Sequence, residues 1–171
     1  MLHIRFQKTI EANIVIKTKG IQYDNHFPIQ DDSEDDIIKH YKENWSGINN
    51  LNIKEYNFEN DFENVEFTEN ISVSATNYGT KSGERILFTV NAFNNNDYLP
   101  KRYRNRKLPL EIQRGFLDED ELLINIPEDY KVEALPNAKE IENEYGSYIT
   151  SFEKINEEKS IIYKRKLFIR E

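Results

Sequence analysis

The chain of 171 residues contains no cysteine. Disulfides, thiolate metal ligands and cysteine nucleophiles all need a thiol, so the sequence excludes all three from this chain. No apolar run approaches the ~20 residues that cross a bilayer, and we expect no membrane span. No N-terminal segment has the order of regions that marks a signal peptide, although the chain could be a piece of a longer exported protein.

Histidine is scarce, with only His3, His26 and His40. None of them stands in an H-E-x-x-H or H-x-H pattern, so no zinc site is predicted. The G-x-S-x-G elbow of serine hydrolases is missing, although a convergent Ser–His–carboxylate triad has no fixed spacing and stays open. We therefore expect no catalytic residue, no metal and no cofactor in this chain.

The formal net charge is −8, and an acidic chain works against the phosphate contacts of nucleic-acid binding. We therefore expect no nucleic-acid partner. Residues 101–107 form the basic cluster of the sequence, and its candidate partner-binding residues are Arg102, Tyr103, Arg104 and Arg106. The alternative, which the net charge favours, is a charged connector or edge strand, where Lys and Arg block edge-to-edge pairing.

Apolar residues alternate with polar ones along much of the chain, as half-buried strands require. In residues 65–75 the apolar residues stand at odd positions, and only Glu69 breaks the set. Turn residues follow at 77–83, and residues 86–92 alternate on even positions, which predicts one long hairpin. Shorter strands are predicted around residues 4–6, 14–16, 51–58, 108–112, 122–126 and 130–134.

Between Ile53 and Tyr56 the apolar parity slips by one residue, which predicts a β-bulge near Lys54 and Glu55.

A second hairpin is predicted from residues 148–155 and 161–169, which flank a short polar turn. Its second strand carries apolar residues on both faces, whereas an edge strand that faces water usually alternates cleanly. We therefore expect this strand to be central in its sheet. Arg165 interrupts one apolar face and, if buried, needs a carboxylate or carbonyl partner.

One helix is predicted at about residues 33–46. Ser33 and Asp36 have the spacing of a capping box, and acidic residues fill the first turn, where the helix dipole favours negative charge. Gly47 is expected to end the helix in a left-handed conformation. The apolar residues that share its predicted buried face are Ile37, Ile38, Tyr41 and Trp45.

Together these patterns predict a mostly β chain, folded as an antiparallel β-sandwich with one covering α-helix. We expect a single domain over residues 1–171. An alternative description is two packed halves, with the strands and helix of residues 1–97 in one and the hairpin region of residues 98–171 in the other.

Four soft motifs in the second half of the chain carry a family resemblance. They are R-K-L-P-L over residues 106–110, I-P-E-D-Y-K-V-E-A-L-P over residues 126–136, Y-G-S-Y over residues 145–148 and I-I-Y-K-R-K-L over residues 161–167. Their order resembles the C-terminal β-rich domain, itself of unknown function, of bacterial transglutaminase-like proteins. The order of helix and hairpin upstream is similar as well.

The resemblance implies that a catalytic Cys-His-Asp set lies in a separate papain-like domain of the same parent chain. It also implies a bacterial protein exported to the periplasm or the cell surface. Two functions follow as hypotheses: a non-catalytic structural or docking module for that domain, and a free-standing binding module for polysaccharide or peptide ligands. Exposed coplanar aromatic rings on a sheet face would favour the second, and a broad apolar patch near a terminus would favour the first.

Overall fold

Strands make up most of the regular structure. The computed structural model describes residues 2–6, 9–94, 104–105, 107, 111–112, 114–155 and 159–171. The first half of the chain holds β1 (Leu2–Phe6), β2 (Thr9–Lys19), η1 (Gly20–Gln22), α1 (Tyr23–His26), η2 (Phe27–Asp31), α2 (Glu34–Asn44), β3 (Leu51–Asp61) and β4 (Glu66–Thr76). The remainder holds β5 (Thr80–Ser82), β6 (Arg85–Leu87), β7 (Phe116–Asn125), β8 (Lys139–Asn143), β9 (Gly146–Ile155) and β10 (Ser160–Ile169).

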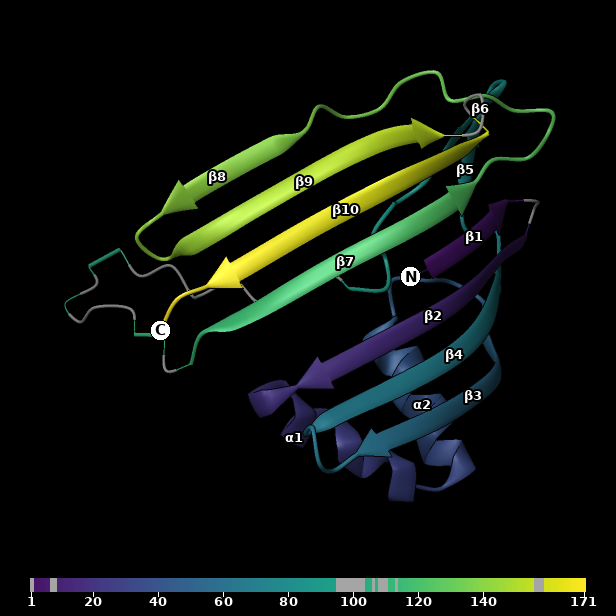
Figure 1. Cartoon of the computed structure of the whole chain (residues 1–171). Helices are drawn as coiled ribbons and strands as arrows, with labels where there is room; N and C mark the ends of the chain where they lie inside the picture. Colours follow the sequence, from purple (N-terminus) through teal and green to yellow (C-terminus); the bar gives the residue numbers. More distant parts are fainter. Residues whose placement is uncertain are drawn as a thin grey trace.

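Eight of these strands form one continuous sheet in the order β3-β4-β2-β1-β7-β10-β9-β8, and β5 and β6 form a separate two-stranded sheet. All neighbouring pairs are antiparallel except β1 and β7, which run parallel. The short strand β1 therefore joins two antiparallel groups, β3-β4-β2 and β7-β10-β9-β8 (Figure 1). The helices lie against the β3-β4-β2 group (Figure 1).

The predicted mostly β, largely antiparallel character is confirmed. The sandwich is not confirmed, because eight of the ten described strands hydrogen-bond in one continuous sheet and not in two stacked ones. The division into one domain or two halves stays a prediction.

The predicted long hairpin between residues 65–75 and 86–92 is wrong. Instead, β4 pairs with β3 on one side and with β2 on the other. The β3–β4 turn is built by Asp61, whose carboxylate oxygen Oδ1 accepts from the backbone N–H groups of Glu63 and Asn64. Such an Asx turn reverses the chain without glycine, which is why it was missed in the sequence. The glycine-containing turn at Gly83 joins only the short strands β5 and β6.

Two further expectations along the strands have different outcomes. The predicted bulge is confirmed, since the β3–β4 register shifts between Ile53 and Glu55. The predicted strand at 130–134 is wrong, because these residues have no regular structure. The predicted strand at 108–112 lies largely outside the described residues.

The C-terminal hairpin is confirmed as β9 and β10, paired over ten residues each. Strand β10 also pairs along its whole length with β7, so it is central in the sheet as predicted. Gly146 begins β9 at φ 150°, and a Cβ there would lie 2.0 Å from the Phe168 carbonyl oxygen. Only glycine permits this close approach of the two strands.

Helix α2 is the predicted helix. The Ser33 hydroxyl accepts from the backbone N–H of Asp36 at 3.3 Å and donates to the Asp36 carboxylate at 2.6 Å. Ile37, Tyr41 and Trp45 are buried, but Ile38 is only half-buried. The helix ends at Asn44 with Trp45 as its C-cap, and Gly47 is not in the left-handed region, so that expectation is wrong.

The single-turn helix α1 and the two 3-10 segments beside it were not predicted. Among the described residues, no helix is long and apolar enough to cross a membrane.

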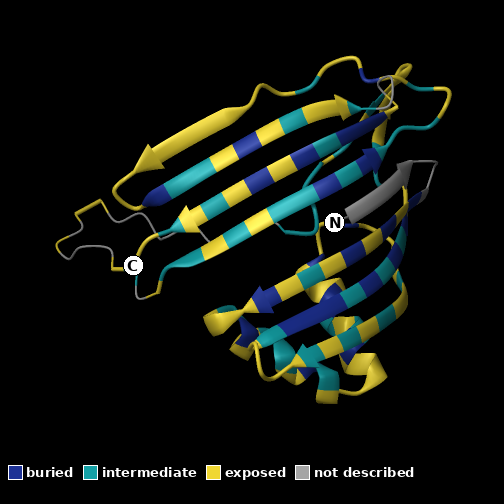
Figure 2. Ribbon diagram, in the orientation of Figure 1, coloured by how far each residue is buried: buried dark blue, intermediate teal, exposed yellow. Residues whose placement is uncertain are grey.

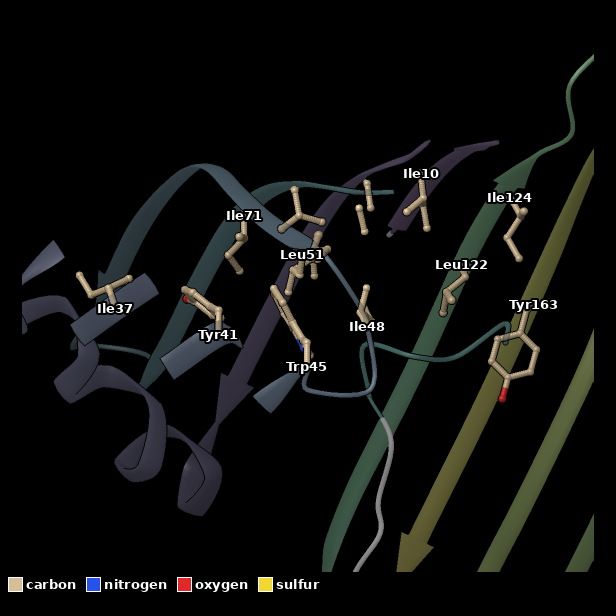
Figure 3. Packing of buried hydrophobic residues seen from close by; sticks show 14 of the residues in the cluster. Ile10, Ile37, Tyr41, Trp45, Ile48, Leu51, Ile71, Leu122, Ile124 and Tyr163 are labelled. Atoms are coloured by element: carbon tan, nitrogen blue, oxygen red, sulfur yellow. The ribbon is translucent and has the colours of Figure 1, made fainter. Parts of the chain in front are cut away.

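The buried core is one cluster that extends from α2 across both strand groups. Figure 3 shows Tyr41, Trp45 and Ile48 in a row that leads from the helix toward Leu122 of β7. Tyr41 and Trp45 stack with ring centroids 5.0 Å apart, and the Trp45 indole N–H donates to the Phe93 carbonyl oxygen at 2.9 Å. Along β7, β10 and β9 more buried residues broadly alternate with more exposed ones, whereas β8 is exposed throughout (Figure 2).

Candidate functional site

Of the four candidate partner-binding residues in the basic cluster, only Arg104 is described, and it is exposed in a turn. Arg102, Tyr103 and Arg106 lie outside the described residues. The interpretation of this cluster as a binding site therefore stays a prediction.

The most distinctive surface of the described chain is one face of β7, β10 and β9, which we call the outer face. Phe168 lies directly opposite Leu117 of β7, and Ile149 of β9 lies diagonally across from it, opposite Lys166. These three side chains keep 37%, 43% and 39% of their surface exposed, respectively. Phe168 lies one residue before the end of β10.

Two cross-strand ion pairs continue the outer face beyond the patch. Lys166 reaches Glu119 at 2.9 Å and Lys164 reaches Glu121 at 3.2 Å. Around them lies an open hollow of about 320 Å³, lined in part by Ile149. Exposed pairs of this kind contribute at most about 1 kcal/mol to stability, but they impose a charge pattern on the surface.

The opposite, inner face of the same strands carries a buried polar cluster around Arg165. Arg165 lies directly opposite Asp120 in the β10–β7 register and donates through Nε to its carboxylate. Asn94 donates to the other Asp120 oxygen at 2.8 Å, and Gln22 donates to Asp118 at 2.8 Å. The cluster thus connects the two central strands to the segment after β6 and to η1. The Asp120 carboxylate is one of the two kinds of partner, carboxylate or carbonyl, that the sequence predicted for Arg165.

Arg165 is only 7% exposed, and among the described residues its Nη2 has no hydrogen-bond partner. The Asp118 carboxylate oxygen Oδ2 lies 4.0 Å from this nitrogen. A guanidinium without its full set of acceptors is costly to bury. The nearby carboxylates of Asp118 and Asp120 therefore supply most of the interaction energy that offsets this cost.

A second buried polar cluster surrounds Glu69 on β4. One carboxylate oxygen lies 2.6 Å from His26 Nδ1, and the other accepts from the Tyr41 hydroxyl at 2.6 Å. Burial and the adjacent Glu69 carboxylate raise the pKa of Tyr41 far above its usual value. Glu69 therefore connects α1 and α2 to the sheet through side-chain contacts. In the sequence, Glu69 stood out as the single charged residue among the apolar positions of residues 65–75.

The described histidines and acidic residues bear on whether the chain could bind a metal ion. The two described histidine side chains, His26 and His40, bond to Glu69 and to Asn44. No group of three or more His, Asp or Glu residues that could hold a metal ion occurs in the described part of the chain. The apolar patch on the outer face, in contrast, offers surface suited to contact with another protein surface.

Sequence reasoning identified Arg165 and Glu69 as anomalies but missed the outer face as a site. The sequence predicted apolar residues on both faces of the strand that holds Phe168. The register of Phe168 with Leu117 and Ile149, however, depends on contacts between distant segments. No local pattern encodes such contacts.

One family model matches residues 84–171, just over half of the chain. Its description is a domain of unknown function with a solved structure, DUF3858. The match includes β7, β8, β9 and β10 in full, and so all the strands of the outer face. No curated protein and no solved structure matches the chain.

Proposed function

The chain belongs to the DUF3858 family of domains of unknown function, and from this premise we propose that it is a non-catalytic structural or docking module. Its partner is a transglutaminase-like, papain-like domain of the same parent chain, in a bacterial protein exported to the periplasm or the cell surface. The motifs that resemble such proteins, at residues 106–167, all fall within the residues matched by the family model.

The apolar patch on the outer face carries the proposal. Leu117, Ile149 and Phe168 are exposed next to one another on adjacent strands. The helices cover a different part of the sheet (Figure 1). Such a patch on a sheet loses its exposure to water when a partner covers it, and this burial favours association. The neighbouring ion pairs of Lys164 and Lys166 would set the orientation of the partner, because charges at the rim give specificity more than affinity.

A free-standing binding module for polysaccharide or peptide ligands is the alternative. It would use aromatic rings aligned on one platform, as stacking on sugar rings requires a flat apolar surface. Among the described residues, the most exposed aromatic rings are those of Phe62, Tyr145 and Phe168. They come from the β3–β4 turn, the β8–β9 turn and β10, which favours the docking function.

The absence of cysteine supports the non-catalytic part of the proposal, because transglutaminase-like chemistry needs a thiolate. For the fold, we propose that the β3-β4-β2 and β7-β10-β9-β8 groups act as two layers of a sandwich. The support for this is that a single core cluster contains residues of both groups, such as Ile71 and Ile124.

Amide hydrogen exchange in the parent protein and in the isolated chain tests this proposal. We expect the amides of β7, β9 and β10 around Leu117, Ile149 and Phe168 to exchange more slowly in the parent, because the partner covers them. The exchange of β3 serves as the internal reference. Equal exchange on the outer face in the two proteins would refute docking through it, as would a parent chain without a papain-like domain.

A further inference from the structure

Strand β8 forms an edge of the eight-stranded sheet. Among the described strands it pairs only with β9, in a regular register from Lys139 opposite Thr150 to Asn143 opposite Gly146. All five of its residues are exposed. A strand in this position presents unpaired N–H and C=O groups along its free edge, to which another strand can add.

The opposite edge of the sheet is protected in a way that β8 is not. Strand β3 carries the bulge between Ile53 and Glu55, which breaks its regular spacing of backbone groups. Bulges of this kind prevent the addition of a further strand. Strand β8 has no register shift, so it is the better template of the two edges.

The two faces of β8 differ in chemistry. Glu140 and Glu142 share the outer face with Ile149, while Lys139, Ile141 and Asn143 lie on the other face. Protected edges often carry a charge at the central inward position, but here that position holds Ile141, which is 54% exposed. The centre of the β8 edge is therefore apolar, and the β8 residues on the outer face are acidic.

The charges determine which strand can pair there. An antiparallel pair of two β8 strands centred on Ile141 would place Glu140 of each copy opposite Glu142 of the other. Like charges directly opposite each other destabilise strand pairing, so a second copy of this chain is disfavoured. The net charge of −8 opposes self-association in the same way.

We propose that β8 binds, by strand addition, an extended segment of another protein with basic side chains on both sides of an apolar residue. The apolar residue covers Ile141, and the basic side chains pair with Glu140 and Glu142. Glu142 already lies 3.7 Å from Arg170, but both groups are largely exposed, so a partner cation can replace this weak contact.

A fluorescent synthetic peptide of alternating threonine and lysine with a central valine is the probe. Titrated into the chain at low ionic strength, it should bind saturably and slow amide exchange in residues 139–143. The double variant Glu140→Lys/Glu142→Lys should bind it about tenfold more weakly, because two attractive cross-strand pairs become repulsive. That variant should bind a matching peptide with glutamate in place of lysine more tightly than the unmodified chain does.

A matched control separates this site from general attraction to an acidic protein. The variant Glu63→Lys/Glu84→Lys makes the same change in net charge at two exposed turn positions away from β8 and should bind the lysine peptide normally. Equal weakening in both double variants, exchange protection outside residues 139–143, or no saturable binding would each overturn the proposal. The peptide assay needs no papain-like partner, so its outcome is independent of the docking function.

Discussion

Arg165 on β10 lies directly opposite Asp120 on β7, and its guanidinium donates to that carboxylate in the buried inner face of the sheet. This pair fixes the register of the two strands that also present Phe168 and Leu117 on the outer face. A shift of this register by one residue would move every side chain of β10 to the opposite face. Arg165 would then be exposed and Phe168 would be buried. The buried pair therefore positions the proposed docking surface.

Replacing Arg165 by methionine should lower the free energy of unfolding by about 3 kcal/mol, because the partly buried carboxylates of Asp118 and Asp120 would lose their buried cation. Urea denaturation measures this loss. The matched control is Lys166→Met, the next residue, whose pair with Glu119 is exposed and should contribute less than about 1 kcal/mol. If both variants lose the same stability, the buried pair does not hold the sheet together.

Gly146→Ala should cost more than about 2 kcal/mol, since its Cβ would meet the Phe168 carbonyl and its φ of 150° strains any side chain. Gly47→Ala is the control, because a Cβ at Gly47 meets nothing within 4 Å. It should change stability by no more than about 0.5 kcal/mol. Similar melting temperatures for the two variants would contradict the close approach of β9 and β10.

Stability should fall as the pH rises above 10. Burial and the Glu69 carboxylate raise the pKa of Tyr41, and burial raises the pKa of Tyr163 to about 12. Both tyrosines ionise near pH 10 when the chain is unfolded. Their stabilising contribution is therefore complete below pH 10 and is lost as the pH rises toward the folded values, because the unfolded state loses its protons first.

Tyr41→Phe tests the sign of this effect. The variant should be less stable than the unmodified chain at neutral pH, because Glu69 loses a donor. Above pH 10 the stability of this variant should fall less steeply with pH than that of the unmodified chain. The two slopes differ by up to about 1.4 kcal/mol per pH unit, the value for one proton, so the two stabilities approach each other as the pH rises. Tyr130→Phe removes the same hydroxyl at a position that no described contact connects to Glu69, and it serves as the matched control for the loss of that donor. Parallel curves for Tyr41→Phe and the unmodified chain would contradict the assigned burial of Tyr41.

Much of the local structure could be predicted from the sequence. The cap at Ser33 and the apolar spacing of Ile37 and Tyr41 identified α2, and a parity slip identified the bulge in β3. These features depend on residues close together in the chain, where side-chain chemistry alone determines the backbone. A carboxylate or carbonyl partner for Arg165 was also expected, because an unpaired buried charge is too costly.

The arrangement of the strands could not be predicted in this way. Alternation shows which face of a strand is apolar but not which strand is its neighbour, so β4 was paired wrongly and the parallel contact of β1 with β7 was missed. Strand β8 has only one apolar residue, Ile141, and so gave no strand signal. The outer face depends on these pairings and was therefore beyond the reach of local patterns.

The most direct test of the proposed docking function is a calorimetric titration of this chain with the separately produced papain-like domain of its parent. We predict binding that is lost when Leu117 and Phe168 are both replaced by lysine. Binding should persist in Val15→Lys, which changes a residue with 40% exposure on β2, in the other strand group. Circular dichroism would establish that each variant is folded. No binding by the unmodified chain, or equal binding by the Leu117→Lys/Phe168→Lys variant, would contradict the account.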